Sequence, residues 1–253
     1  MMRVAAFLCV LTVLICSAPS AVAQTNRTLP GDLRLDLNGG GGGQQTLSVP
    51  IQILLFLTVL SFIPAILISV TSFTRIVIVF HFLRHALGTN ETPSNQIVIG
   101  LTLFLTFFIM APVAEDINKN ALQPMMAGSI TQAEALATAI KPLRGFMVKY
   151  TREKDLALFL SIAKQPRPKT NDDIPTTVMI PAFMISELKT AFQIGFVLFL
   201  PFLIIDMVVA TVLLSMGMMQ LPPVMVSIPF KILLFIMVDG WNLVVGSLVK
   251  SFY

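Results

Sequence analysis

The chain has 253 residues, of which 55% are hydrophobic and only 12% are charged. Soluble domains carry about 25% charged residues, so this composition excludes an ordinary water-soluble fold and predicts an all-α membrane protein. The formal net charge of +4 is small and spread along the chain. Because no run of basic residues could follow a phosphate backbone, nucleic acid is not an expected partner.

The first 23 residues are typical of a cleavable signal peptide. A short basic start precedes an apolar run, 4–16, that is too short to span a bilayer, and the small residues of 21–23 suit cleavage. Both cysteines, Cys9 and Cys16, lie in this segment. The mature chain would then have no cysteine for disulfides, catalysis or metal binding. A lipoprotein signal ending at Cys16 is the alternative, which Ile15 disfavours because such processing needs a small residue.

A polar leader and three apolar stretches come next. Residues 24–48 end in a five-glycine run whose backbone freedom burial cannot offset, so a flexible leader is expected. Residues 49–70 carry no charge over 22 residues, enough to cross a hydrocarbon core of about 30 Å. The stretch 73–87 is interrupted by arginines and histidines, and 97–114 is again uncharged. The segment 49–114 is therefore predicted to form the N-terminal apolar helices.

The middle region, 115–190, is predicted to lie in water because it holds 10 of the 17 Lys and Arg residues. Thr131 followed by Glu134 predicts a capping box at the start of one amphipathic helix, and Pro142 predicts the first turn of a second. A cleaved signal leaves the mature N-terminus outside the cytoplasm, and the span 49–70 returns the chain inside. The middle region is therefore expected in the periplasm.

Residues 191–253 predict a helical hairpin with a methionine-rich tip. Its two apolar blocks, 191–219 and 221–249, meet at a glycine followed by two prolines, which end one helix and begin the next. Pro201 and Pro229 lie inside the blocks and are expected to kink them. With the two uncharged stretches before the middle region, hydropathy alone counts four spans.

Five charged residues interrupt the apolar blocks: Arg75, Arg84, Asp206, Lys231 and Asp239. Each costs about 2.5–3.5 kcal/mol at a bilayer centre on insertion scales, so lipid exposure is not expected and these side chains mark an interior. One interpretation is a conduction path or proton relay. The other is structural pairing between helices or subunits, for instance of Lys231 with Asp206 or Asp239.

The sequence carries no pattern typical of an enzyme or a metal site. His81 and His85 lie four residues apart, but Arg84 beside them would repel a metal and there is no His-Glu-x-x-His motif. The glycine run lacks the lysine and hydroxyl of a nucleotide-binding loop. Asp206 and Asp239 have no catalytic context around them. We therefore expect no catalytic residue, no cofactor and no metal.

Methionines gather at the predicted hairpin tip, at Met216, Met218 and Met219 before Gln220. Unbranched, polarisable thioethers repack against differing surfaces, so a ring of them is suited to closing a pore that must still admit a chain. The alternative is that these methionines fill gaps in a core. Their position at a turn, where a packing residue is less needed, favours the gate.

Two stretches resemble the FliP family, whose SctR relatives serve in virulence injection systems. The first runs Phe73-Thr74-Arg75-Ile76-Val77-Ile78-Val79 into Leu83-Arg84 and Pro93-Ser94-Asn95-Gln96. The second runs from Phe183-Met184-Ile185-Ser186-Glu187 through Pro201-Phe202-Leu203-Ile204-Ile205-Asp206 and the methionine tip to Pro229-Phe230-Lys231 and Asp239-Gly240-Trp241. An ordered match of this length is specific and covers most of residues 49–253.

The resemblance implies a non-enzymatic subunit of the type III export gate of the flagellum, a multi-pass protein of the bacterial inner membrane and flagellar basal body. Kinked helical hairpins of about five copies would assemble into an oligomeric ring with FliQ and FliR, alongside FlhA, FlhB and FliO. Unfolded flagellar subunits would pass through its centre. The family implies that Met218 and Met219 line the closed constriction, with Gln220 where another methionine is expected. It also implies ring contacts at Phe146, Phe159 and Glu187.

Three other functions stay open at this stage. The same subunit in a virulence injection system would carry similar residues. A small-molecule or ion transporter would also use intramembrane charges and kinked helices, but predicts internal symmetry that the sequence does not show. A membrane scaffold without a pore would be indifferent to changes at the methionine tip.

Overall fold

The computed structural model describes residues 49–253 except 90, 91, 167, 169 and 219. The predicted signal peptide, the glycine-rich leader and Met219 lie outside the described residues. The chain divides into two compact units between Leu67 and Ile68, and each is described by itself. Throughout the described ranges the regular structure is helical, which confirms the predicted all-α class.

The first unit contributes most of α2 (Val49–Val70), a helix of 22 residues without a charged side chain. The other elements follow in chain order: α3 (Phe73–Ala86), α4 (Asn95–Ile117), a π-helical turn η1 (Asn118–Leu122), α5 (Gln123–Met126), α6 (Gln132–Tyr150), α7 (Glu153–Ile162), a 3-10 turn η2 (Asn171–Asp173), α8 (Thr176–Ser215), α9 (Pro223–Met237) and α10 (Gly240–Lys250).

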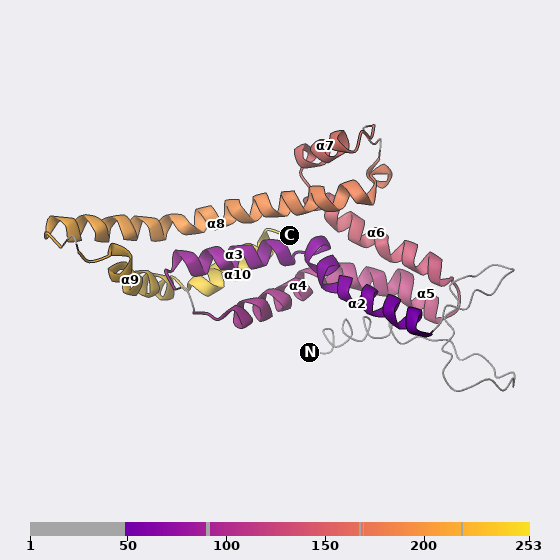
Figure 1. The fold of residues 1–253 in the computed structure, drawn as a ribbon, viewed down its shortest axis with the longest axis horizontal. Coiled ribbons are helices and arrows are strands. Elements are labelled where there is room, and N and C mark those ends of the chain that lie inside the picture. Colours follow the sequence, from indigo (N-terminus) through magenta and orange to yellow (C-terminus); the bar gives the residue numbers. More distant parts are fainter. Residues whose placement is uncertain (1–48, 90–91, 167, 169, 219) are drawn as a thin grey trace. The chain divides into compact units, whose positions relative to one another are not determined.

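The core of the second unit forms where α3 packs along the middle of α8 (Figure 1). Ile76, Val79, Phe80 and Leu83 recur at helical spacing on α3, and each is at most 2% exposed. Phe183 on α8 is also almost fully buried. Because each such side chain contributes about 1.5–3 kcal/mol on burial, this seam stabilises the unit. The core thus contains the stretch 73–87, the apolar stretch that arginines and histidines interrupt in the sequence.

Helix α6 begins as predicted and continues further than predicted. The Thr131 hydroxyl accepts from the amide of Glu134, and the Glu134 carboxylate accepts from the amide of Thr131, which confirms the capping box. The Glu134 carboxylate accepts from the Thr131 amide and also from the Thr131 hydroxyl, and these two hydrogen bonds, the one from the amide first, hold the pKa of Glu134 below its ordinary value.

The prediction that Pro142 opens a second helix is wrong. Pro142 lies inside the single helix α6, which runs through it to Tyr150. A proline there removes one backbone hydrogen bond and costs about 3 kcal/mol. Phe146 and Met147, one turn further on, are buried in the core and offset that cost. Packing on both sides of the proline therefore keeps one helix where local propensity favours two.

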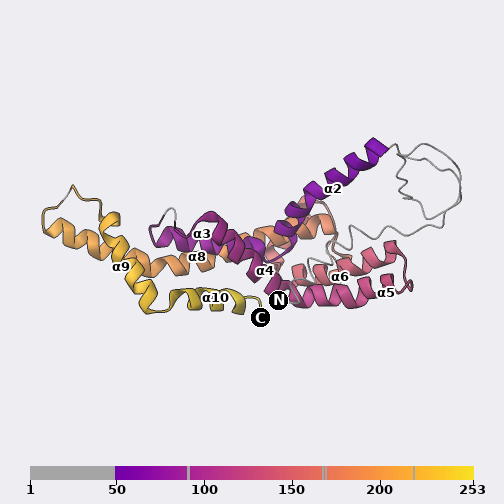
Figure 2. The same cartoon turned by 90° about the horizontal axis from the view of Figure 1, so that it is seen from below.

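The last third forms the predicted hairpin, with two differences. Helix α8 is continuous over 40 residues, so it starts in the predicted middle region and crosses the expected boundary at 190/191. The second block runs through Pro229 as α9 and is interrupted at Asp239, where α9 and α10 are bent by 66° (Figure 2). Asp239 has φ 50°, a left-handed conformation that ends a helix.

Close packing explains why glycine follows Asp239. A Cβ atom on Gly240 would lie 2.2 Å from the ring of Phe235, which is itself buried. Only a residue without a side chain lets α10 begin so close to the end of α9.

Within the described residues, two helices are long and apolar enough to cross a membrane, Asn95–Met126 and Thr176–Ser215. The number rises to four if each bent pair of helices is one span, and one of those pairs joins Phe56–Val70 to α3. The four spans predicted from the sequence did not include α3, which was expected in the cytoplasm after the span 49–70. Membrane topology therefore stays a prediction.

Candidate functional site

The hairpin tip is built by a glycine C-cap and two prolines. Helix α8 ends at Ser215, and the amide of Met218 donates to the carbonyl of Leu213 at 3.0 Å. Gly217 between them has φ 75°, which the Schellman type of helix end requires. Pro222 takes an extended conformation and α9 starts at the next proline. The break predicted at this position is confirmed.

The tip presents apolar side chains to its surroundings. Met216 is 67% exposed, Met218 is 40% exposed, and Gln220 is also exposed. On either side of the tip, Met207 and Met225 are equally open. In a single subunit these thioethers do not fill a core, so the packing alternative does not account for them.

A buried ion pair joins the two arms of the hairpin. Lys231 of α9, only 2% exposed, donates through Nζ to a carboxylate oxygen of Asp206 on α8 at 2.6 Å. The fully buried hydroxyl of Ser227 donates to the other oxygen of the same carboxylate. The pairing alternative for these charges is thereby observed, with Asp206 rather than Asp239 as the partner of Lys231.

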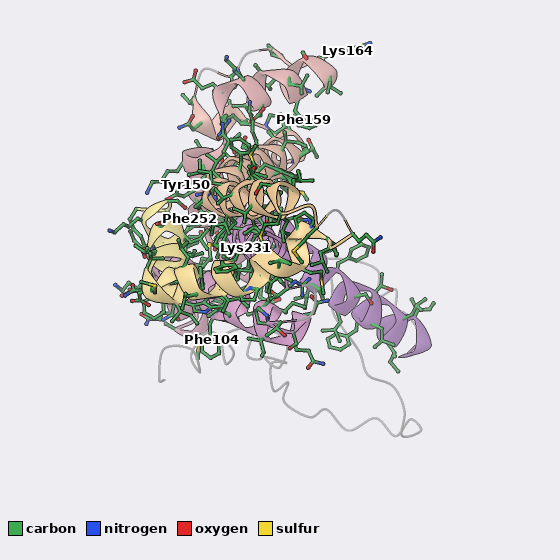
Figure 3. All side chains as sticks on the ribbon, turned by 90° about the vertical axis from the view of Figure 1, so that its left-hand side faces the viewer. Phe104, Tyr150, Phe159, Lys164, Lys231 and Phe252 are labelled. Carbon is green, nitrogen blue, oxygen red and sulfur yellow. The ribbon has the colours of Figure 1, made fainter. Side chains whose placement is uncertain are left out.

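A second buried pair lies in the core. The Nε of Arg75 on α3 donates to Glu187 on α8 at 2.8 Å, and a second guanidinium nitrogen contacts the other carboxylate oxygen. This bidentate geometry is the strong form of the Arg–carboxylate interaction. The guanidinium carbon also lies 3.8 Å from the ring centre of Phe252 and 5.4 Å from that of Tyr150. Figure 3 shows these two rings side by side.

The residues proposed as ring contacts have different surroundings. Glu187 is fully buried and bound to Arg75, and Phe146 is buried against the rings of Phe183 and Tyr150. Phe159, on the short helix α7, is half-buried. The ring contacts of all three stay predictions, and of the three only Phe159 keeps part of its ring open within the described subunit.

The remaining charged residues of the apolar blocks, Arg84 and Asp239, lie at helix ends. Arg84, in the last turn of α3, donates to the side-chain oxygen of Asn95 at 2.7 Å. Asp239 accepts from the side chain of Asn242 at 3.1 Å, at the break between α9 and α10. Neither has an ionic partner among the residues that the structure describes.

In the part of the chain that the structure describes, no three His, Cys, Asp or Glu side chains cluster as metal ligands. Asp206 is held by a lysine and a serine rather than by a second acid. The arrangement can brace helices, and it does not assemble a nucleophile with a base.

Sequence reasoning missed two contributors. Ser227 lies one turn before Lys231 on the same face of α9, and this four-residue spacing was a usable signal. Phe252 had no such signal, because its contact with Arg75 joins positions 177 residues apart at opposite ends of the second unit.

Comparison with known proteins identifies the family. The family model described as "FliP family" matches residues 54–248. The "Flagellar biosynthetic protein FliP" of Bacillus subtilis (strain 168) is 61% identical over 208 residues, 82% of this chain and 94% of the relative. The protein of that name from Pectobacterium carotovorum is 50% identical over 236 residues, 93% of this chain and 89% of the relative. The one from Caulobacter vibrioides is 45% identical over 251 residues, 99% and 92% of the two chains. The chain therefore belongs to the FliP family.

Proposed function

We propose that this chain is a membrane-embedded subunit of the flagellar protein export apparatus, and that its hairpin tip closes the export channel. The observation that carries the proposal is the exposed methionine tip on a hairpin braced by Asp206 and Lys231. Copies of the chain form a ring with FliQ and FliR in the bacterial inner membrane at the flagellar basal body. FlhA, FlhB and FliO complete the apparatus, and unfolded flagellar subunits are the cargo.

A seal at the tip has to exclude water when it is closed and to open around a passing chain. A constriction lined by apolar side chains stops ions by excluding water, and a flexible lining can open around a chain of varying sequence. Met216 and Met218 have both properties. Gln220 adds one polar group at the same turn, which makes the lining less uniformly apolar.

The ion pair below the tip explains how side chains that can repack are held at a fixed place. The ion pair of Asp206 and Lys231 ties α8 to α9 about two helical turns below the tip. An ordered pair of arms below the tip positions the methionines without restricting their side chains. The subunit acts as a structural part and not as an enzyme.

The alternatives lose support from particular observations. The relatives compared above carry flagellar names, which favours a flagellum over an injection system. A transporter was suggested by charges within apolar helices, but Arg75 pairs with Glu187 and Lys231 with Asp206. These charges have structural partners and do not require a transported ion.

Site-directed cross-linking tests the ring. In a chain in which Cys9 and Cys16 are replaced by serine, Met218→Cys introduces a single thiol at the tip. Treatment of intact cells with a short bismaleimide should link copies of the chain to one another. Met237→Cys, at the other end of α9 and 77% exposed, is the matched control and should link far less. Equal linking at both positions, or none at the tip while export continues, would show that the tips do not converge.

A further inference from the structure

Arg84 lines two neighbouring hollows. It belongs to the last turn of α3, and it borders both a wide, open hollow of mixed lining and a narrow apolar recess. The gate proposed above uses the far hairpin tip and assigns no role to Arg84. A charged side chain that borders apolar surface on two sides is suited to an amphiphile.

The wide hollow combines an apolar wall with three nitrogen-bearing side chains. Its volume is about 440 Å³, and its lining consists of Ile78, His81, Phe82, Arg84, His85 and Thr89. His81 and His85 are both exposed. The hollow therefore has one permanent cation and two imidazoles that can donate hydrogen bonds, which is the chemistry that holds a phosphate group.

The guanidinium of Arg84 is positioned but not neutralised by the residues that the structure describes. One nitrogen donates to Asn95 at 2.7 Å and another lies 3.3 Å from Nδ1 of His81. No carboxylate among the described residues forms an ion pair with it. Asn95 and His81 fix the plane of the guanidinium, while further N–H groups stay available for an anion.

The apolar recess continues from the same arginine. Its lining includes Leu83, Pro93, Ile97, Leu101 and Trp241. Its volume of about 20 Å³ is too small for a ring system and suits the flank of a single hydrocarbon chain. Trp241 is 42% exposed, and tryptophan at the edge of an apolar surface is typical of the membrane interface.

An exposed apolar stripe leads from the recess along α4. Ile97, Phe104 and Phe108 are 62%, 67% and 74% exposed, and with Leu101 they recur at intervals of three and four residues on one face. Figure 3 shows Phe104 pointing away from the packed helices at the edge of the molecule. At 1.5 Å per residue the stripe is about 16 Å long, which matches half of a hydrocarbon core of about 30 Å.

We infer that Arg84 is the headgroup anchor of a binding site for an anionic phospholipid. The phosphate lies against Arg84, His81 and His85, and one acyl chain runs past Trp241 and along the stripe on α4. A free phosphate ion would satisfy Arg84, His81 and His85 equally, but it would leave the recess and the stripe without an occupant. The length of the stripe and its continuity with the arginine favour the lipid.

The single tryptophan of the chain makes the site directly observable. Trp241 is the only tryptophan, so its fluorescence in the full chain reports on this place alone. We would reconstitute the chain in vesicles of neutral lipid and add a small fraction of phosphatidylglycerol brominated on one acyl chain. Phosphatidylcholine with the same brominated chain gives the reference, because bromine quenches tryptophan only at short range.

The anionic lipid should quench Trp241 at about fivefold lower mole fraction than the neutral lipid, the effect of one arginine near an anionic headgroup. Arg84→Gln should remove this preference, and Arg84→Lys should keep part of it. Lys189→Gln, which removes an exposed charge on α8, should leave it unchanged. A circular dichroism spectrum unchanged from the parent chain establishes that each variant is folded.

Three results would overturn the inference. Equal quenching by both lipids in the parent chain would show that no headgroup is recognised. Loss of the preference in Lys189→Gln as well as in Arg84→Gln would show that net charge alone attracts the lipid. Suppression of the preference by inorganic phosphate, but not by chloride at the same ionic strength, would assign the hollow to a free anion.

Discussion

The ammonium group of Lys231 on α9 lies 2.6 Å from a carboxylate oxygen of Asp206 on α8, across the two arms of the terminal hairpin. Lys231 is only 2% exposed, so the pair lies in an environment where either charge alone would be costly. The pair connects two helices whose only covalent link is the turn at the tip. It thereby fixes how the tip is presented.

Removal of one member of this pair should destabilise the hairpin. Asp206→Asn leaves the ammonium of Lys231 buried without a counter-charge, and a loss of about 3–5 kcal/mol is expected. The measurement is thermal unfolding of the purified chain in detergent. The exchange variant Asp206→Lys with Lys231→Asp restores the pair and should recover part of the loss. If the exchange variant is no more stable than the single one, the pair is not a brace.

The break between α9 and α10 should depend on the absence of a side chain at Gly240. Gly240→Ala places a Cβ 2.2 Å from the buried ring of Phe235, and overpacking of this kind costs about 1–3 kcal/mol. Gly246→Ala on the same helix meets no atom within 4 Å and should be neutral or slightly stabilising. The unfolding temperatures of the two variants give the comparison. Equal unfolding temperatures for the two variants would mean that the ring of Phe235 moves to make room for the added methyl group.

Phe252 should stabilise the core through its contact with Arg75. Phe252 is 3% exposed and lies over the guanidinium, so Phe252→Ala should cost about 3–5 kcal/mol as a large-to-small core change. The adjacent Tyr253 is 77% exposed, and Tyr253→Ala should alter stability by less than about 0.5 kcal/mol. Denaturant unfolding in detergent micelles separates these expectations. A small effect of Phe252→Ala would mean that the Arg75–Glu187 pair holds without its aromatic cover.

The capping box of α6 should depend on Thr131 and on pH. Thr131→Ala removes the acceptor for the amide of Glu134 and should cost about 1 kcal/mol, whereas Thr131→Ser keeps it. Because the pKa of Glu134 is lowered in the folded chain, its contribution is present above the ordinary carboxyl pKa and is lost as the pH falls through the lowered one.

The pH dependence is measured by unfolding the parent chain and the Glu134→Gln variant at neutral and at acidic pH. The two chains should differ at neutral pH and converge in acid. A difference that persists in acid would place the effect elsewhere than on the Glu134 carboxylate.

Local signals in the sequence were enough for the helices and the turns. Thr131 with Glu134 predicted a helix start, and the glycine and prolines of the tip predicted the end of one helix and the start of the next. Pro142 misled because its cost of about 3 kcal/mol is offset by the burial of Phe146 and Met147, which no local pattern shows.

Pairing between distant residues was only partly accessible. Charge in apolar blocks predicted that Lys231 would need an acid, and the fold then selected Asp206 over Asp239. The break at Asp239 was not predicted, because proline at position 229 was the stronger local signal. The left-handed conformation of Asp239 and the close packing of Gly240 against Phe235 are seen only in the folded chain.

The central claim is that the methionine tip seals the export channel. The most direct test replaces Met218 and Met219 by alanine in intact cells and measures both ion leakage and the export of flagellar subunits. We predict raised leakage with the complex still assembled, because alanine shortens the apolar lining. Met237→Ala, at an exposed methionine at the other end of α9, should cause none. Unchanged leakage and export in the double variant would contradict the account and leave these methionines without a sealing role.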